Sequence, residues 1–153
     1  MGGFFGAVSH RDVVMDVFFG VDYHSHLGTH RGGLAAWNPE DGFQRAIHGI
    51  EKTPFRTRFE NDIAGMRGNA CLGVISDRDP QPLLIRSRLG VYALCFTGRI
   101  NNADALEEEY IREMDGYFEA QSGSRTNEVE LVAALINRKA TFAEGIAYAQ
   151  ERI

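Results

Sequence analysis

The sequence predicts an α+β domain, in which strands form a sheet early in the chain and later helices cover it. Two observations support this class. Short apolar runs bounded by glycine and turn-forming residues are concentrated before residue 100, which is typical of strands. Apolar residues at helical spacing dominate after residue 102. With 153 residues, the chain is expected to form one domain spanning 1–153.

Apolar runs of strand length recur along the first two thirds of the chain. The first run is expected to be a buried strand, and the glycine-rich segment 27–33 a turn or a close-contact loop. Residues 38–42 are a strong turn signal inside a predicted hairpin. The runs at 70–76 and 91–100 are predicted to be central strands. In chain order, strands are predicted at 3–9, 34–37, 43–50, 70–76, 83–87 and 91–100.

Five segments have helical periodicity: 11–26, 56–67, 103–114, 127–138 and 141–152. The first is expected to begin at an N-cap on Ser9, with Asp12 three residues later. It is expected to bury one face, made of Val13, Val14, Val17, Phe18 and Val21. The acidic run Glu107–Glu109 is predicted to be a solvated helix face. No strand is predicted after the last helix, so we expect a fold truncated at its C-terminus, from the N-terminal part of a longer protein.

Composition excludes several classes of function. The net charge of −5 argues against nucleic-acid binding, which needs a basic patch. No apolar run reaches the ~18 residues of a membrane span, and the first residues lack the features of a signal peptide. Cys71 and Cys95 lie in apolar runs and are predicted to be reduced core residues. We therefore expect a cytoplasmic protein without membrane or nucleic-acid partners.

Five segments, in order from residue 2 to about residue 136, resemble the class II glutamine amidotransferases, and especially the glutaminase domains of amidophosphoribosyltransferases. The start GGFFGAVSHRDV resembles the family opening CGIxG…xRDV, and LGTHRGGLAAW resembles LxHRGxxxAGIA. The other segments are CLGVISDRDPQPL, which resembles GHxRYAT…QPL; LCFTGRINNADAL, which resembles LAHNGNLxNxxxL; and SRTNEVELVAALI, which resembles SDTEVLAxLI.

The resemblance implies the N-terminal-nucleophile (Ntn) hydrolase fold, a four-layer αββα sandwich. It also implies a mechanism. An N-terminal Cys thiolate attacks the side-chain amide of glutamine, and its own α-amine, with an ordinary pKa of ~8, serves as the base. An Asn side chain and a Gly amide form the oxyanion hole. An Arg and an Asp bind the substrate carboxylate and amine. No cofactor or metal is implied.

Most of the reactive residues of the family are absent at the matching positions. Gly2 stands in place of the nucleophilic Cys. Thr97 stands in place of the oxyanion Asn, although the following Gly98 is retained. A nucleophile's absence alone removes nearly all covalent catalysis. The catalytic position of the family is therefore expected to be inactive here.

The substrate-binding positions are altered as well. The carboxylate-binding Arg matches Ser76 or Asp77, and the nearby Arg78 is a candidate substitute. The amine-binding Asp matches Thr126, with Asn127 adjacent. Arg31 of the HRG segment is retained, and the resemblance implies that it supports the substrate site.

The resulting hypothesis is a catalytically degenerate glutaminase-like domain of an amidophosphoribosyltransferase-like protein of purine synthesis. Glutamine or another small amide is its expected ligand, and a phosphoribosyltransferase domain and further copies of the chain are its expected partners. Two alternatives stay open. One is an active amidotransferase whose residue 2 has been altered, and the other is a small-ligand or protein-binding module on the same fold.

Two further sets of side chains suggest different chemistry. His24, His26 and His30 lie near Asp22 and could hold a metal, but their spacing does not match a ligand motif. Cys71 and Cys95 could be nucleophiles, but cysteines in buried strands are usually inert. We therefore expect no metal and no second nucleophile.

Overall fold

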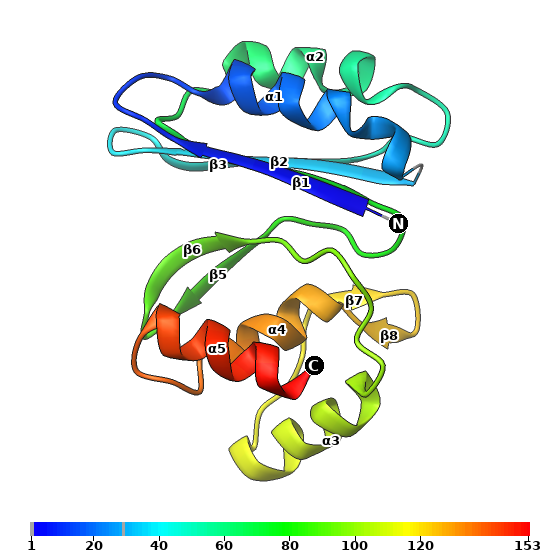
Figure 1. Cartoon of the computed structure of the whole chain (residues 1–153), viewed down its shortest axis with the longest axis vertical. Helices are drawn as coiled ribbons and strands as arrows, with labels where there is room; N and C mark the ends of the chain where they lie inside the picture. Colours follow the sequence, from blue (N-terminus) through cyan, green and yellow to red (C-terminus); the bar gives the residue numbers. More distant parts are fainter. Residues whose placement is uncertain (1, 29) are drawn as a thin grey trace. The chain divides into compact units, whose positions relative to one another are not determined.

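The computed structural model describes residues 2–28 and 30–153, which form two compact units, Met1–Pro82 and Leu83–Ile153. The first unit contains a four-stranded antiparallel sheet in the order β1-β4-β2-β3. Figure 1 shows the helices of this unit on one side of its sheet. The strands are β1 (Gly2–Val8), β2 (Arg31–Asn38), β3 (Gly42–Gly49) and β4 (Ala70–Ser76).

The predicted hairpin and the central position of 70–76 are confirmed. β2 pairs with β3 across the turn at 38–42, and β4 lies between β1 and β2. The side chain of Asn38 shapes the turn, since its Oδ1 accepts hydrogen bonds from the backbone N–H groups of Glu40 and Asp41 at 2.9 and 2.7 Å.

The expectation that the first strand is buried was wrong. Phe4 and Val8 are 61% and 85% exposed. Within the described residues β1 is an edge strand whose one strand partner is β4, and α1 contacts β1. Because side chains alternate between the two faces of a strand, Phe4 and Val8 point away from the face that carries Phe5, whose ring contacts Gly20 of α1.

The helices α1 (Val14–Tyr23) and α2 (Phe55–Gly65) cover the sheet. The predicted apolar face of α1 is confirmed, because all five of its residues are buried: Val13, Val14, Val17, Phe18 and Val21. The predicted start was wrong. The N-cap position is Val13, and Asp12 Oδ1 accepts the Val14 N–H at 2.9 Å. Because the Asp12 carboxylate already accepts a backbone N–H at the start of the helix, Ser9 is not needed as a cap. A short 3-10 helix, η1 (Ser25–Leu27), follows.

The segment predicted as a glycine-rich turn is partly a strand, because β2 already begins at Arg31. The expected close contact is present within that strand. A Cβ added to Gly33 would lie 1.8 Å from the backbone oxygen of Gln81. Only glycine therefore lets the segment that precedes Pro82 pack directly on β2.

The second unit contains α3 (Ala103–Met114), α4 (Glu128–Ile136) and α5 (Phe142–Arg152). Its strands form two antiparallel pairs, β5 (Leu83–Ser87) with β6 (Gly90–Leu94), and β7 (Gln121–Ser122) with β8 (Arg125–Thr126). α4 packs on α5 and α3. The helices supply most of a separate apolar core that includes Leu106, Leu131, Leu135 and Ala149.

The prediction of a central strand at 91–100 was wrong in length and in position. β6 ends at Leu94 and has only β5 as its partner in the described residues. Residues 95–100 form no ladder, and Phe96 and Ile100 belong to the core formed with the helices. An apolar run can bury its side chains without being a strand, and pattern alone does not distinguish the two.

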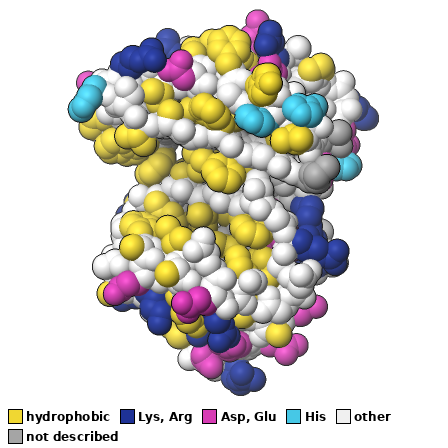
Figure 2. Space-filling view, viewed as in Figure 1, with side chains coloured by type: hydrophobic (Ala, Val, Ile, Leu, Met, Phe, Trp, Pro, Cys, Tyr) yellow, Lys and Arg dark blue, Asp and Glu magenta, His cyan; other side chains and the backbone are white. Residues whose placement is uncertain are grey.

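Among the described residues, no helix is long and apolar enough to cross a membrane. Basic and acidic side chains are interspersed on the surface of the second unit in the view of Figure 2. Such mixing is typical of an ordinary solvated surface.

Candidate functional site

At one end of the first unit's sheet, the first residues of β1 and β2 and the last residue of β4 form one row. Gly2 of β1 pairs with Ser76 of β4, and Ser76 pairs with Arg31 of β2 on its other side. Directly paired residues of antiparallel strands point to the same face. The position of the family nucleophile and the retained Arg31 therefore lie at the same end of one sheet.

Gly2 lies in a position that has no room for a side chain. A Cβ built on this residue would be 2.6 Å from the backbone oxygen of Ile75. The obstacle is backbone in the central strand β4, so β1 or β4 would have to move to admit it. The neighbouring Gly3 has more space, since its nearest atom would be Cδ1 of Leu27 at 3.4 Å.

The loop after β4 brings Asp77 and Arg78 to the same end of the sheet. The backbone N–H of Arg78 donates to Oγ of Ser76 at 3.1 Å, which turns the chain after the strand. Asp77 and Arg78 are half-buried, and Asp79 and Gln81 are buried at 4% and 3% exposure. This packed loop holds the candidate substitute Arg78 next to the row formed by Gly2, Ser76 and Arg31.

The two residues predicted to match the family's oxyanion hole belong to the second unit. Thr97 and Gly98 lie in the segment that joins β6 to α3, where Thr97 is half-buried and Gly98 exposed. Gly98 has a φ of +153°, outside the range that residues with a side chain usually adopt. Retention of glycine at this position thus has a local backbone reason.

Thr126 and Asn127 lie together where β8 leads into α4. Asn127 is 1% exposed, and its Oδ1 accepts the backbone N–H of Val129 at 2.9 Å, which caps the helix. Thr126 donates its hydroxyl to Oε1 of Glu107 at 2.7 Å. Asn127 therefore has a structural task, and the carboxylate of Glu107 from α3 lies beside Thr126, the predicted match to the family's amine-binding Asp.

Sequence reasoning missed Glu107, because the run Glu107–Glu109 was predicted to be a solvated face. Glu107 and Glu109 are half-buried. Glu109 pairs with Arg138 at 3.4 Å and also with Arg152. Only Glu108 fits the prediction as an exposed residue. The spacing of the run could not predict these contacts, because the partners Thr126, Arg138 and Arg152 lie far along the chain.

The histidine cluster does not converge. Nδ1 of His24 lies 2.6 Å from the Gly20 oxygen, and Nδ1 of His26 lies 3.0 Å from the Tyr23 oxygen. His30 pairs with Glu51 at 2.6 Å, which lowers the pKa of the Glu51 carboxyl below its ordinary value. In residues 2–28 and 30–153, no three His, Cys, Asp or Glu side chains are grouped so that they could hold a metal ion.

The two cysteines are poor nucleophiles as they stand. Burial raises the pKa of the Cys71 thiol, and that of the Cys95 thiol, to about 12. Cys71 lies in the core under the helices of the first unit. Thiolates are therefore rare at neutral pH in both positions, as expected from the sequence.

The fold of this chain is similar to part of two larger solved enzymes. Two solved structures are similar over 99% of this chain, each with a TM-score of 0.80. One is described as glutamine phosphoribosylpyrophosphate (PRPP) amidotransferase from B. subtilis complexed with ADP and GMP, at 23% identity. The other is described as the allosteric regulatory enzyme of purine biosynthesis, at 21% identity. The chain spans about a third of their lengths, 32% and 33%.

Comparisons of sequence alone give no match: no family model fits the chain, and no curated protein matches it. The likeness to solved structures, at these identities, establishes the fold. The α+β class is confirmed, with antiparallel sheets and five α-helices in the described residues.

Proposed function

We propose that this chain is a glutaminase-like domain that has lost the hydrolysis of glutamine. Gly2 carries the proposal. It lies at the end of β1 where the family has its nucleophile, and a Cβ on this residue would be 2.6 Å from the Ile75 oxygen. A residue altered from Cys in an otherwise active site would leave space for the lost side chain. At Gly2, the backbone of β4 occupies the space that a side chain would need. This supports the view that the packing of β1 on β4 now requires glycine at this position.

The other altered positions support the same proposal. Thr97 replaces an amide that would donate to an oxyanion, and Thr126 replaces a carboxylate that would bind an amine. Arg78 is the remaining candidate for binding a substrate carboxylate at the sheet end that carries Gly2. Loss of the nucleophile alone would stop covalent catalysis. The additional loss of the oxyanion donor and of the amine partner therefore supports a natural loss of function over a single altered residue.

In this proposal the chain is the N-terminal part of a longer amidophosphoribosyltransferase-like protein. The domain stabilises or regulates a phosphoribosyltransferase domain, which takes ammonia from solution. The proposal includes the four-layer Ntn fold that the resemblance implies, and assembly with further copies of the chain. It rests on the fold likeness and on the order of the five resembling segments.

One observation favours the alternative in which the domain binds a small amino acid without cleaving it. The carboxylate of Glu107 accepts the hydroxyl of Thr126, so an acidic group is still present at the amine position. Titration of the protein with L-glutamine would test this alternative. We expect Glu107→Gln to weaken any binding about tenfold, and the exposed neighbour Glu108→Gln to leave it unchanged.

Restoring the nucleophile tests the main proposal. Gly2→Cys is expected to give no glutamate release from glutamine, because the new side chain meets the Ile75 backbone and the oxyanion and amine partners are still absent. Gly3→Cys is the matched control, with a thiol one residue away where a side chain fits. Thiol titration and a thermal melt of each variant establish that the thiol is present and the protein folded. Robust turnover by folded Gly2→Cys alone would favour the active-enzyme alternative and overturn the proposal.

A further inference from the structure

The two edges of the first unit's sheet differ in how they are protected. β3, at one edge, carries the exposed Arg45, and its His48 binds Asp62 of α2 at 2.8 Å. Charged side chains on an edge strand oppose the addition of a further strand. β1, at the other edge, has no charged residue and no proline. Figure 1 shows β1 at the near edge of this sheet.

The backbone of β1 is regular, and half of its polar groups point outward. The strand pairs with β4 over all of its seven residues without a bulge. Just beyond it, the N–H of Ser9 donates to the oxygen of Asn69 at 2.8 Å, which continues the same register. Hydrogen-bonded positions alternate in an antiparallel ladder. The odd-numbered residues therefore bond to β4, and residues 2, 4, 6 and 8 direct their N–H and C=O groups away from it.

The side chains at these outward positions are self-complementary. Phe4 and Val8 are 61% and 85% exposed, whereas Gly2 and Gly6 have no side chain. When a second β1 lies antiparallel with Phe5 opposite Phe5, Phe4 of each copy lies beside Gly6 of the other, and Val8 beside Gly2. An aromatic side chain that covers a glycine of the neighbouring strand is a favourable cross-strand pair.

This register is also favoured by the backbone and by charge. It places even-numbered residues opposite even-numbered ones, so the outward backbone groups of the two copies meet. A shift in either direction shortens the ladder. Because residues 2–8 are neutral, no like charges meet along the strand, although the net charge of the chain is −5.

We propose that β1 is a dimerisation edge, at which two copies of this chain join their sheets by antiparallel β1–β1 pairing about a two-fold axis at Phe5. Such a contact uses the same surface on both copies, so it closes as a dimer. One strand from each copy is much less than the ~20–30 residues a side of a standard interface, so we expect a reversible dimer with a dissociation constant of ~100 µM. The inference rests on the proposed function only in specifying its assembly with further copies, and it does not depend on the loss of hydrolysis.

Sedimentation velocity from ~10 µM to ~1 mM protein tests the dimer, because this range spans the expected dissociation constant. Phe4→Lys places a charge on the edge and should raise the dissociation constant at least about tenfold. Met15→Lys is the matched control, since Met15 is also apolar and is 48% exposed on α1. It should leave the dissociation constant unchanged. Thermal melts establish that both variants are folded.

A cysteine at the two-fold axis tests the register. Residue 5 would face its own copy as a non-hydrogen-bonded pair, with Cα atoms ~4.5 Å apart, which suits a disulfide. Phe5→Cys should therefore give a covalent dimer on air oxidation, and Ala7→Cys, which would face Gly3, should not. Mass spectrometry without reductant measures both.

Three results would overturn the proposal: monomer at every concentration, a dimer that Phe4→Lys leaves intact, or no link through residue 5. The first would leave the edge to a strand of a different protein, and the second would place the interface elsewhere. Because none of these results involves glutamine, each is distinguishable from a failure of the proposed function, which the Gly2→Cys assay reports.

Discussion

At the scale of single residues, two glycines allow close contacts between backbone segments of the first unit. Gly2 and Gly33 both lie where a side chain would meet backbone, at 2.6 and 1.8 Å from the nearest oxygen. At Gly2 the absence of a Cβ lets β1 lie close to the backbone of β4, and at Gly33 it lets the loop that follows β4 pack on β2.

Gly33→Ala should destabilise the protein by about 3 kcal/mol, because the new methyl group overlaps the Gln81 oxygen and the strand cannot yield easily. Gly65→Ala is the matched control. It lies at the end of α2 with no atom near its added Cβ, and alanine there should be neutral or stabilising by up to about 1 kcal/mol. Urea unfolding compares the two variants. Equal stabilities would contradict the close packing of β2 on this loop.

The cysteines permit a prediction about reactivity. With thiol pKa values raised to about 12 by burial, Cys71 and Cys95 should be alkylated by iodoacetamide at pH 8 about a thousandfold more slowly than in urea-unfolded protein. The stability that the neutral thiols contribute is present below the ordinary pKa of 9.0 and is lost as the pH rises toward 12. Mass spectrometry of the alkylated peptides measures both rates. Rapid labelling of either thiol in the folded protein would reveal a reactive cysteine.

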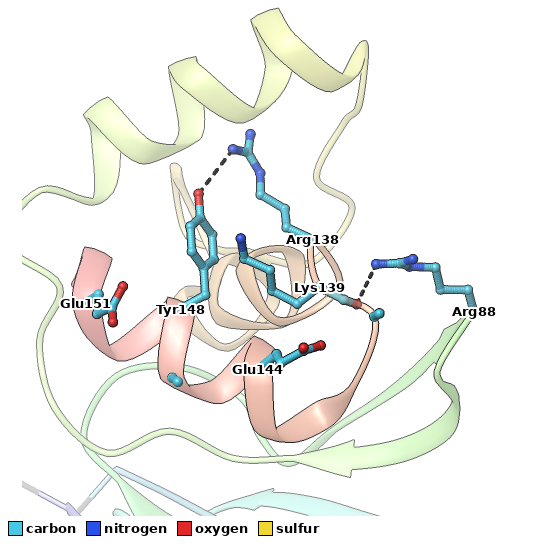
Figure 3. Close-up of a pocket in the computed structure, with 8 residues that line it drawn as sticks. Arg88, Arg138, Lys139, Glu144, Tyr148 and Glu151 are labelled. Carbon is cyan, nitrogen blue, oxygen red and sulfur yellow. Dashed lines mark hydrogen bonds between the residues drawn. The ribbon is translucent and has the colours of Figure 1, made fainter.

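At the scale of elements, side-chain caps begin two helices of the second unit, α4 and α5. Asn127 caps α4, and Thr141 and Glu144 form a reciprocal capping box on α5. The capping box begins the helix that carries Tyr148, whose hydroxyl accepts a hydrogen bond from Arg138 at 3.4 Å (Figure 3).

Thr141→Ala should lower the free energy of unfolding by about 1 kcal/mol, because the N–H of Glu144 loses its acceptor. Thr57→Ala is the control: Thr57 is exposed in the first turn of α2 and is not the capping residue, so alanine should be tolerated there. Denaturant midpoints for the two variants give the comparison. A Thr141→Ala midpoint equal to that of the unaltered protein would show that the capping box contributes nothing.

Sequence patterns predicted the bounds of helices and strands better than they predicted which elements lie beside each one. The bounds of β4, β5 and α3 agree with the structure, because each has a clear period and clear end signals. Patterns could not reveal that β1 is an edge strand, since exposure of Phe4 depends on which strands lie beside it. They also extended β6 to residue 100, because apolar side chains buried under helices resemble those of a strand.

The candidate site was predictable only in part. The motif order placed Gly2, Arg31 and Arg78 in segments that the structure brings to one sheet end. Glu107 was missed because its partner Thr126 is 19 residues away and the intervening fold decides the contact. The lack of room for a side chain at Gly2 could not be predicted either, because it depends on the register between β1 and β4.

At the scale of the whole molecule, the chain consists of two units, each with its own apolar core. Residues that match the family's reactive groups are divided between them. Gly2, Asp77 and Arg78 belong to the first unit, and Thr97 and Thr126 to the second.

The most direct test of the central claim is release of glutamate from glutamine by the unaltered protein, at saturating glutamine and neutral pH. We predict release no faster than in buffer, because residue 2 provides no thiolate and both cysteine thiols stay protonated. Saturable turnover that copurifies with the protein would contradict the account. It would mean that another group is the nucleophile and that the match of Gly2 to the family's Cys is wrong.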